Sequence, residues 1–280
     1  MPLNPGNMYG FSHMNEVAQI LTANFVILIA CTLLLWLISI PLRDVSFVDS
    51  FWAAGFIVVA GSTYAMTGGA TDRREWLFLI TAVWGARLAA YLFLRWRREG
   101  PDGRYVALLK KAPGNVHLFS LRKVFLLQAP LLWVVSLPVQ LGQIEAEPPG
   151  FGVLAWIGVA LAVVGIFFEA AGDHQMAAFK SNPDNEGKVM DRGLWRYTRH
   201  PNYFGDCCVW WGLYLIAAET SLGVWSIFGP ALLTWLLVRW SGVPLLERRL
   251  QRSRPGYAEY LKRTSSFIPW PPAGDKEPRN

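Results

Sequence analysis

Long apolar runs alternate with short polar connectors along most of the 280-residue chain. A run of about 20 such residues is long enough for an α-helix to cross the hydrocarbon core of a bilayer. Five runs are free of charge, and two more carry one charge each, Arg87 and Asp206. The pattern predicts an all-α membrane protein with seven transmembrane helices, at about residues 17–42, 50–71, 76–95, 124–144, 150–180, 202–219 and 220–240.

Behind the seventh predicted helix the periodicity changes. Residues 244–264 mix leucines with arginines and tyrosines, which is typical of an amphipathic helix lying on a membrane surface. Residues 271–280 are polar and predict a disordered tail. The remainder, residues 1–270, is expected to form a single integral membrane domain.

Composition supports this reading, because hydrophobic residues make up 53% of the chain, which holds 14 Trp and has a mean hydropathy of +0.27. A soluble domain of this length does not need so much apolar surface. Basic residues gather in residues 95–123, in residues 173–203 and in the segment after 239, whereas the loop around Glu145 has none. The positive-inside rule then places the C-terminus in the cytoplasm and the N-terminus outside, with the first run as an uncleaved signal anchor.

Cysteine and histidine spacing gives no sign of a metal site or a disulfide. Cys31, Cys207 and Cys208 fall in or beside predicted spans and form no CxxC motif. The histidines have no ligand-like spacing with them. We therefore expect no metal.

The segment from Gly193 to Asp206 holds the densest mixture of charge, aromatic rings and turn formers. Arg199 and His200 offer donors directly before Pro201, a residue suited to the first turn of a helix. Asn202 and Asp206 follow four residues apart, on one helical face. A helix N-terminus beside arginines suits a phosphate or carboxylate ligand. The alternative is a basic and aromatic interfacial anchor beside a transmembrane helix.

Other polar residues of the predicted spans fall in the same, cytoplasmic half. Asp49 precedes the second span, Arg87 lies in the third, and Glu169 and Asp173 share a face of the fifth. Buried polar residues in a membrane tend to mark a site, so the pattern predicts one cavity facing the cytoplasm. Structural alternatives stay open, since Asp49 could be a helix cap and Arg87 an ion-pair partner or a snorkelling side chain.

The motif Arg199-His-Pro-Asn-Tyr-Phe-Gly-Asp206, with Arg254-Pro-x-Tyr-x-x-Tyr and Phe-Ile-Pro269 behind it, resembles the signature of membrane steroid and sterol reductases. The chain looks most like the bacterial branch of the steroid 5-alpha-reductase family, over residues 49–269. Isoprenylcysteine carboxyl methyltransferases share a looser version of the C-terminal half. The resemblance implies an NADPH site whose cofactor-binding residues are Arg87, Arg97, Arg104, Asp173, Lys180, Arg199, His200, Asn202, Tyr203, Asp206, Tyr257 and Tyr260.

The active centre departs from the family pattern. Steroid reductases of this family pair a carboxylate of the second helix with a tyrosine of the third, on the ketone oxygen of an enone. Asp49 matches the carboxylate, but Trp84 occupies the tyrosine position, and an indole cannot deliver a proton. Tyr91 or Tyr64 could replace it, and we expect Asp49 with Tyr91 to be catalytic.

The resemblance implies NADPH-dependent reduction of a carbon-carbon double bond conjugated to a carbonyl, in a steroid-like or isoprenoid lipid that enters from the bilayer. A methyltransferase using S-adenosylmethionine on a lipid or isoprenylated substrate is the first alternative, and a lipid carrier without a cofactor is the second. The expected setting is a bacterial inner membrane with the cofactor site facing the cytoplasm. Membrane lipids and a lipophilic substrate are the expected partners of a monomer or weak oligomer, without nucleic acid.

Overall fold

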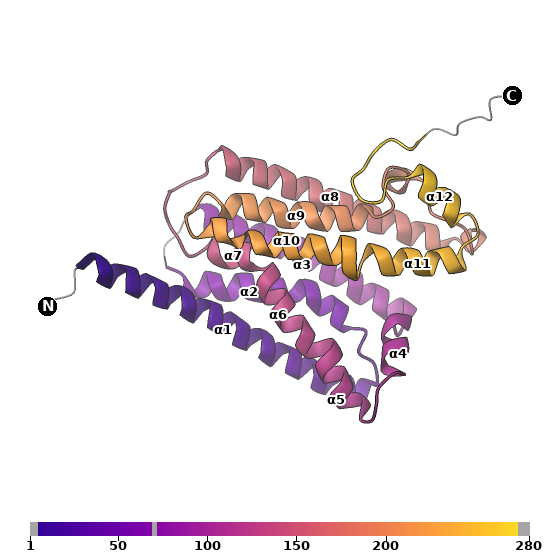
Figure 1. Cartoon of the computed structure of the whole chain (residues 1–280), viewed down its shortest axis with the longest axis horizontal. Coiled ribbons are helices and arrows are strands. Elements are labelled where there is room, and N and C mark those ends of the chain that lie inside the picture. Colours follow the sequence, from indigo (N-terminus) through magenta and orange to yellow (C-terminus); the bar gives the residue numbers. More distant parts are fainter. Residues whose placement is uncertain (1–4, 69–71, 274–280) are drawn as a thin grey trace. The chain divides into compact units, whose positions relative to one another are not determined.

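A computed structural model describes residues 5–68 and 72–273, and the side chains of residues 5–13 are excluded. Within these ranges the regular secondary structure is helical, apart from one isolated β-bridge between Thr198 and Ser265 (Figure 1). Among the described residues, five helical segments are long and apolar enough to cross a membrane, at Met14–Leu42, Asp72–Glu99, Val116–Val135, Val153–Ser181 and Gly223–Ser253. The expectation of an all-α integral membrane protein is confirmed at this level.

Most predicted helices coincide with observed ones. They are α1 (Pro5–Leu42), α2 (Val48–Met66), α3 (Asp72–Glu99), α8 (Val153–Ser181), α9 (Pro201–Ala217) and the run η4 (Gly223–Ile227), α10 (Phe228–Trp235) and η5 (Leu236–Trp240). The amphipathic tail forms α11 (Val243–Ser253) and α12 (Tyr257–Arg263). In the predicted tail 271–280, residues 274–280 lie outside the described part of the chain.

The segment predicted as one helix at 124–144 differs. A helical run begins earlier, with α5 (Val116–Ser120), η1 (Leu121–Phe125) and α6 (Leu126–Val135), and α7 (Leu137–Leu141) follows as a separate helix. Asn115 explains the early start, because its side-chain oxygen accepts the amide protons of His117 and Leu118 at 2.9 and 3.2 Å. The α6–α7 break falls at Ser136, and Pro138 stands in the first turn of α7.

The chain divides into two compact units, which are described separately. The first comprises the chain as far as Trp156 together with Leu213–Gly229, and the second comprises Ile157–Gly212 and the chain from Pro230 on. In the first unit, α2 packs closely along α3, and α1 packs on α2 and α6. Gly85 permits the close α2–α3 contact, since a Cβ there would meet Ile57 Cγ1 at 2.8 Å.

Uncharged polar side chains join α1, α2 and α7 inside this first unit. Asn24 donates to Thr63 Oγ1 at 2.8 Å and to Gln140 Oε1 at 3.0 Å, and all three residues are fully buried. Gln140 in turn donates to Ser136 Oγ at 2.8 Å. Satisfied polar groups cost little in an apolar interior and fix helix register.

A buried ion pair joins the connectors at the N-terminal end of α3. Arg73 is fully buried, contacts Glu219 at 3.3 Å and donates to the carbonyls of Pro148 and Gly150. Glu219 also accepts amide protons from Gly152 and Ala155, at 3.0 and 2.9 Å. Arg73 and Glu219 were not recognised as an ion pair in the sequence, because 146 positions separate them.

In the second unit, α8 and α9 approach each other through glycines. A Cβ on Gly205 would lie 2.5 Å from the carbonyl oxygen of Gly165, and one on Gly212 would lie 2.5 Å from that of Gly158. Small residues let helix backbones come close in membrane proteins. This contact fixes the register between the polar residues of α8 and those of α9.

Candidate functional site

Arg199 and His200, singled out by the sequence motif, converge on one oxygen of Glu247 in α11. Arg199 Nε donates to Glu247 Oε1 at 2.7 Å, and His200 Nε2 lies 3.1 Å from the same oxygen. The guanidinium also donates to the carbonyls of Leu261 and Thr264. Arg199 is thus held by three acceptors of its own chain.

His200 is buried and uncharged at neutral pH. Burial lowers its pKa below the ordinary value of 6.5, and the opposing effect of the Glu247 hydrogen bond does not reverse the shift. Because a carboxylate only accepts hydrogen bonds, Nε2 carries the proton and Nδ1 keeps its lone pair. The ring stacks on Tyr203 with centroids 5.4 Å apart and planes 2° from parallel.

The C-terminal segment returns to the same motif. Ser265 accepts the amide proton of Arg199 at 2.9 Å, and Phe267 accepts the hydroxyl proton of Thr198 at 2.8 Å. The amide of Trp270 donates to the carbonyl of Tyr197 at 2.9 Å. The motif at Arg199–Asp206 and the C-terminal segment, far apart in sequence, are therefore hydrogen-bonded to each other.

Tyr257 and Tyr260 are buried in α12. The Tyr260 hydroxyl donates to the carbonyl of Trp195 at 2.5 Å, so it has a structural partner. Burial raises the pKa of both phenols well above the ordinary value. Both predicted cofactor tyrosines are consequently protonated, and Tyr260 is bound to the motif segment.

Three buried acids, Glu169, Asp173 and Asp206, belong to the helices that meet through glycines. The Asn202 amide lies 3.5 Å from Asp173 Oδ1, at the limit of a hydrogen bond. Lys180, also predicted to bind cofactor, is exposed near the end of α8. Of the predicted set in this unit, the structure links Arg199, His200 and Tyr203 through ring and ion contacts, and Asn202 with Asp173.

Asp49, the predicted catalytic carboxylate, lies in the first unit and has three donors around it. The Tyr105 hydroxyl donates to Oδ1 at 2.6 Å, and Arg104 donates to Oδ2 at 2.7 Å. Arg95 lies 3.9 Å from Oδ2. The helix-cap alternative for Asp49 is wrong, because Phe47 is the N-cap of α2 and Asp49 falls in the first turn, where its side chain turns to these donors.

The position of Tyr105 has a local cause. Asp102 caps α4 (Gly103–Leu109) by accepting the Arg104 amide proton at 2.7 Å, and its own amide donates to Ser46 Oγ at 2.8 Å. These bonds join α4 to the α1–α2 connector. Burial first, and then the negative charge of Asp49, raise the pKa of Tyr105 well above 10.0.

The remaining predicted residues of the first unit lie along α3. Arg87 and Tyr91 are half-buried, and Arg97 is exposed in the last turn. Trp84 is fully buried against Phe56, with ring centroids 5.7 Å apart. Because Trp84 is enclosed in the core, it has a packing role.

Sequence reasoning missed two residues of these clusters, Tyr105 and Glu247. Each had a weak signal: Tyr105 follows a capping Asp102 in a basic loop, and Glu247 is the one acid of α11 among arginines. The predicted cofactor residues are divided between the units. Arg87, Arg97 and Arg104 belong to the first, and the nine from Asp173 to Tyr260 belong to the second.

Comparison with known proteins places these residues in a family. The family described as "Protein of unknown function (DUF1295)" matches residues 35–264, a segment that includes every predicted site residue from Asp49 to Tyr260. The uncharacterized protein C594.04c of Schizosaccharomyces pombe is 23% identical over 269 aligned positions, and the match covers 84% of this chain and 75% of that protein. No solved structure matches the chain.

Proposed function

The chain belongs to the DUF1295 family, and from that premise we propose that it is an NADPH-dependent reductase. Its substrate is a steroid-like or isoprenoid lipid with a carbon-carbon double bond conjugated to a carbonyl. The observation that carries the proposal is the 2.6 Å hydrogen bond from Tyr105 to Asp49, with Arg104 on the other carboxylate oxygen. A protonated phenol can donate to an oxygen that gains negative charge.

In this proposal, Asp49 orients Tyr105 and the phenol serves the substrate oxygen. The raised pKa keeps the phenol protonated, and its single O–H turns from Asp49 to the substrate carbonyl oxygen when the lipid binds and charge builds there. Arg104 is held between Asp49 and Asp102, so its role is to fix the Asp49 carboxylate in place. When bound, NADPH supplies the hydride for the far carbon of the enone. Tyr105 thereby takes the role that we expected of Tyr91.

The side chains of the second unit suit a dinucleotide in part. Asp173 and Asp206 offer carboxylate acceptors for ribose hydroxyls, and Asn202 offers an amide for a polar cofactor edge. Arg199 fits less well than the sequence indicated, because Glu247 and two carbonyls already hold it. The exposed guanidinium of Arg97 suits a phosphate.

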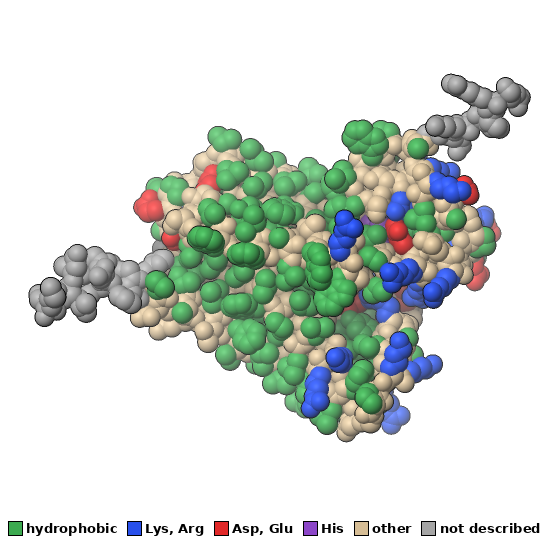
Figure 2. All heavy atoms as spheres, in the orientation of Figure 1, with side chains coloured by type: hydrophobic (Ala, Val, Ile, Leu, Met, Phe, Trp, Pro, Cys, Tyr) green, Lys and Arg blue, Asp and Glu red, His purple; other side chains and the backbone are tan. Residues whose placement is uncertain are grey.

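The proposal includes seven membrane spans, with the N-terminus outside and the C-terminus in the cytoplasm of a bacterium. Two helices beyond the five long apolar segments complete the set, α2 with 19 residues and α9 with 17. The basic side chains around α4 and α5 (Figure 2) support the orientation, because such clusters favour the cytoplasmic side.

Calorimetric titration of detergent-purified protein with NADPH, NADH and S-adenosylmethionine tests the cofactor. We expect NADPH to bind and Asn202→Ala to lose that binding. Asn15→Ala is the matched control, since Asn15 is exposed and precedes the matched family segment. Binding of S-adenosylmethionine alone would replace the reductase by a methyltransferase, and absence of all binding would favour a carrier.

Turnover with enone lipids tests the reaction. Purified protein with NADPH should convert a 4-ene-3-ketosteroid or an isoprenoid enone to a product with two more hydrogens, detected by mass spectrometry. A saturated ketone of the same skeleton is the control and should leave NADPH unconsumed. Reduction of the ketone itself, giving an alcohol, would contradict the proposed chemistry.

A further inference from the structure

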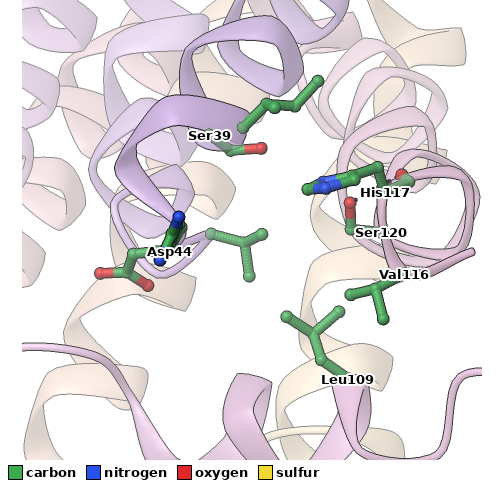
Figure 3. A pocket seen from close by; sticks show the side chains of 9 residues that line it. Ser39, Asp44, Leu109, Val116, His117 and Ser120 are labelled. Atoms are coloured by element: carbon green, nitrogen blue, oxygen red, sulfur yellow. Dashed lines mark hydrogen bonds between the residues drawn. The ribbon is translucent and has the colours of Figure 1, made fainter.

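A cavity of about 460 Å³ opens in the first unit where α1 ends. Figure 3 shows Ser39 of α1 directed toward His117 and Ser120 of α5, with Leu109 and Val116 below them. The complete lining is Ser39, Ile40, Arg43, Asp44, Val45, Leu109, Val116, His117 and Ser120. None of these residues belongs to the Asp49–Tyr105 cluster or to the motif of the second unit.

Two donor side chains of this lining have no partner among the residues that the structure describes. In the described part of the chain, neither the Arg43 guanidinium nor the His117 imidazole makes a hydrogen bond or an ion pair. Asp44 does not neutralise Arg43, because Trp96 and the Ser46 amide hold its carboxylate at 2.6 and 2.8 Å. Figure 3 shows that carboxylate turned away from His117. The cavity therefore offers donors for an anion.

The two serines offer the opposite chemistry. Ser39 donates its hydroxyl proton to the carbonyl of Trp36 at 2.7 Å, and Ser120 donates to that of His117 at 2.8 Å. Their oxygens keep lone pairs that can accept a proton from a ligand. A ligand matched to both sets has an anionic group for Arg43 and His117 and an O–H or N–H donor for the serines.

The rest of the wall and its surroundings are apolar. Ile40, Val45, Leu109 and Val116 line the cavity beside the polar groups. The last turns of α1 expose Leu34, Leu37, Ile38 and Leu42, on a segment apolar enough to span a membrane. Exposed lysines and arginines of α4, η1 and the segment between them lie at the same end of the first unit as the cavity (Figure 2). Polar, basic and apolar surface meet here in the order found at a membrane interface.

We propose that this cavity binds the head group of a membrane phospholipid whose phosphate is linked to a hydroxyl- or amine-bearing alcohol. Arg43 and His117 take the phosphate, Ser39 and Ser120 accept from the head-group alcohol or ammonium, and the apolar wall takes the start of the acyl chains. Phosphatidylglycerol and phosphatidylethanolamine have this chemistry. The site is separate from the reductase proposal and stands without it.

The substitutions that test the cavity are chosen from the backbone conformation and the exposure of each residue. Arg43 has a left-handed backbone with φ of 52°, a conformation that asparagine tolerates better than most residues. Arg43→Asn therefore removes the charge and keeps the turn. His117→Gln removes the imidazole at an exposed position. Arg122→Gln is the matched control, because Arg122 is an exposed cation of the neighbouring η1 and does not line the cavity.

Native mass spectrometry of the full chain, with added phosphatidylglycerol, phosphatidylethanolamine, phosphatidylcholine or diacylglycerol, provides the test. The first two lipids should bind most tightly, because choline has no N–H and diacylglycerol no phosphate. Arg43→Asn and His117→Gln should each weaken phosphatidylglycerol binding roughly five-fold, and Arg122→Gln should leave it unchanged. Thermal melts show whether each variant folds. Neither Arg43→Asn nor His117→Gln should change the NADPH affinity measured by titration.

Three results would overturn the proposal. Equal loss in Arg122→Gln would mean that general surface charge holds the lipid. Equal binding of diacylglycerol would assign the cavity to acyl chains alone. Displacement of phosphatidylglycerol by millimolar inorganic phosphate, with the same dependence on Arg43, would make the cavity a site for a free phosphate.

Discussion

Arg199 Nε donates to Glu247 Oε1 across 2.7 Å, although 48 positions separate the two residues in sequence. His200 shares the same carboxylate oxygen at 3.1 Å. The Arg199 guanidinium and the His200 N–H of the motif are therefore bound to acceptors inside the protein. These contacts fix α11 and the C-terminal segment against the start of α9.

Glu247→Gln should destabilise the protein, because the largely buried Arg199 loses its counter-charge and His200 loses a strong acceptor. We expect the free energy of unfolding to fall by roughly 1–3 kcal/mol. A thiol-reactive dye provides the measurement, since Cys207 and Cys208 are buried in α9 and become reactive on unfolding. Glu259→Gln is the control: that carboxylate is 73% exposed and pairs with Lys262, so its loss should cost under about 0.5 kcal/mol. Equal effects of both variants would show that the Glu247 contacts contribute little.

Tyr105→Phe should lower kcat of enone reduction by about 10²-fold or more, because it removes the hydroxyl that Asp49 orients. Tyr91→Phe is the matched comparison and should have a much smaller effect. NADPH affinity, measured by calorimetry, should stay near the wild-type value in both. A large loss of kcat in Tyr91→Phe with little change in Tyr105→Phe would restore the pair first expected from the sequence.

Hydrophobic patterning predicted most helices, because apolar runs in a membrane protein reflect contact with lipid directly. α8 and α9 begin and end within a few residues of the predicted limits. The α5–α6 run was misplaced, since its start depends on the Asn115 cap and not on hydrophobicity. Local side-chain bonds of this kind carry little signal in composition.

The candidate site was predictable only as a set of residue types. The motif indicated Arg199, His200 and Asn202, and a resemblance supplied their expected ligand. The sequence motif could not indicate Glu247 or Tyr105 as partners, because each pairing depends on how helices distant in sequence meet. Burial also changes the interpretation, since Arg199 looks available for a phosphate in the sequence and is occupied in the structure.

Acid should destabilise the protein through Glu219. Burial raises the pKa of this carboxyl, but hydrogen bonds from Ala155, Gly152 and Arg73 outweigh it and leave the pKa below the ordinary value of 4.5. The stabilisation is thus complete above pH 4.5 and is lost as pH falls through the lower, folded-state pKa. Glu219→Gln should be less stable at pH 7 by roughly 3–5 kcal/mol, because Arg73 is left buried without its counter-charge.

Thermal melts of wild type and Glu219→Gln, from pH 7 down to about pH 3, provide the measurement. The difference in Tm between the two proteins should shrink as pH falls below 4.5. Glu75→Gln is a suitable control, since Glu75 is exposed in the first turn of α3. A constant difference across the range would mean that Glu219 does not titrate with folding.

Gly205→Ala should destabilise the second unit, because its new Cβ would lie 2.5 Å from the Gly165 carbonyl oxygen and 2.6 Å from the Glu169 amide nitrogen. Backbone atoms on both sides leave no side chain to move aside, so α8 and α9 must separate. We expect a loss of roughly 1–3 kcal/mol in the free energy of unfolding, measured with the same thiol dye. Gly61→Ala in α2 is the control, since its Cβ would meet only Phe78 at 3.6 Å and alanine favours the helix. If both variants melt alike, the two helices are not in contact at Gly205, and the register that we infer for Asp173 and Asn202 is lost with that contact.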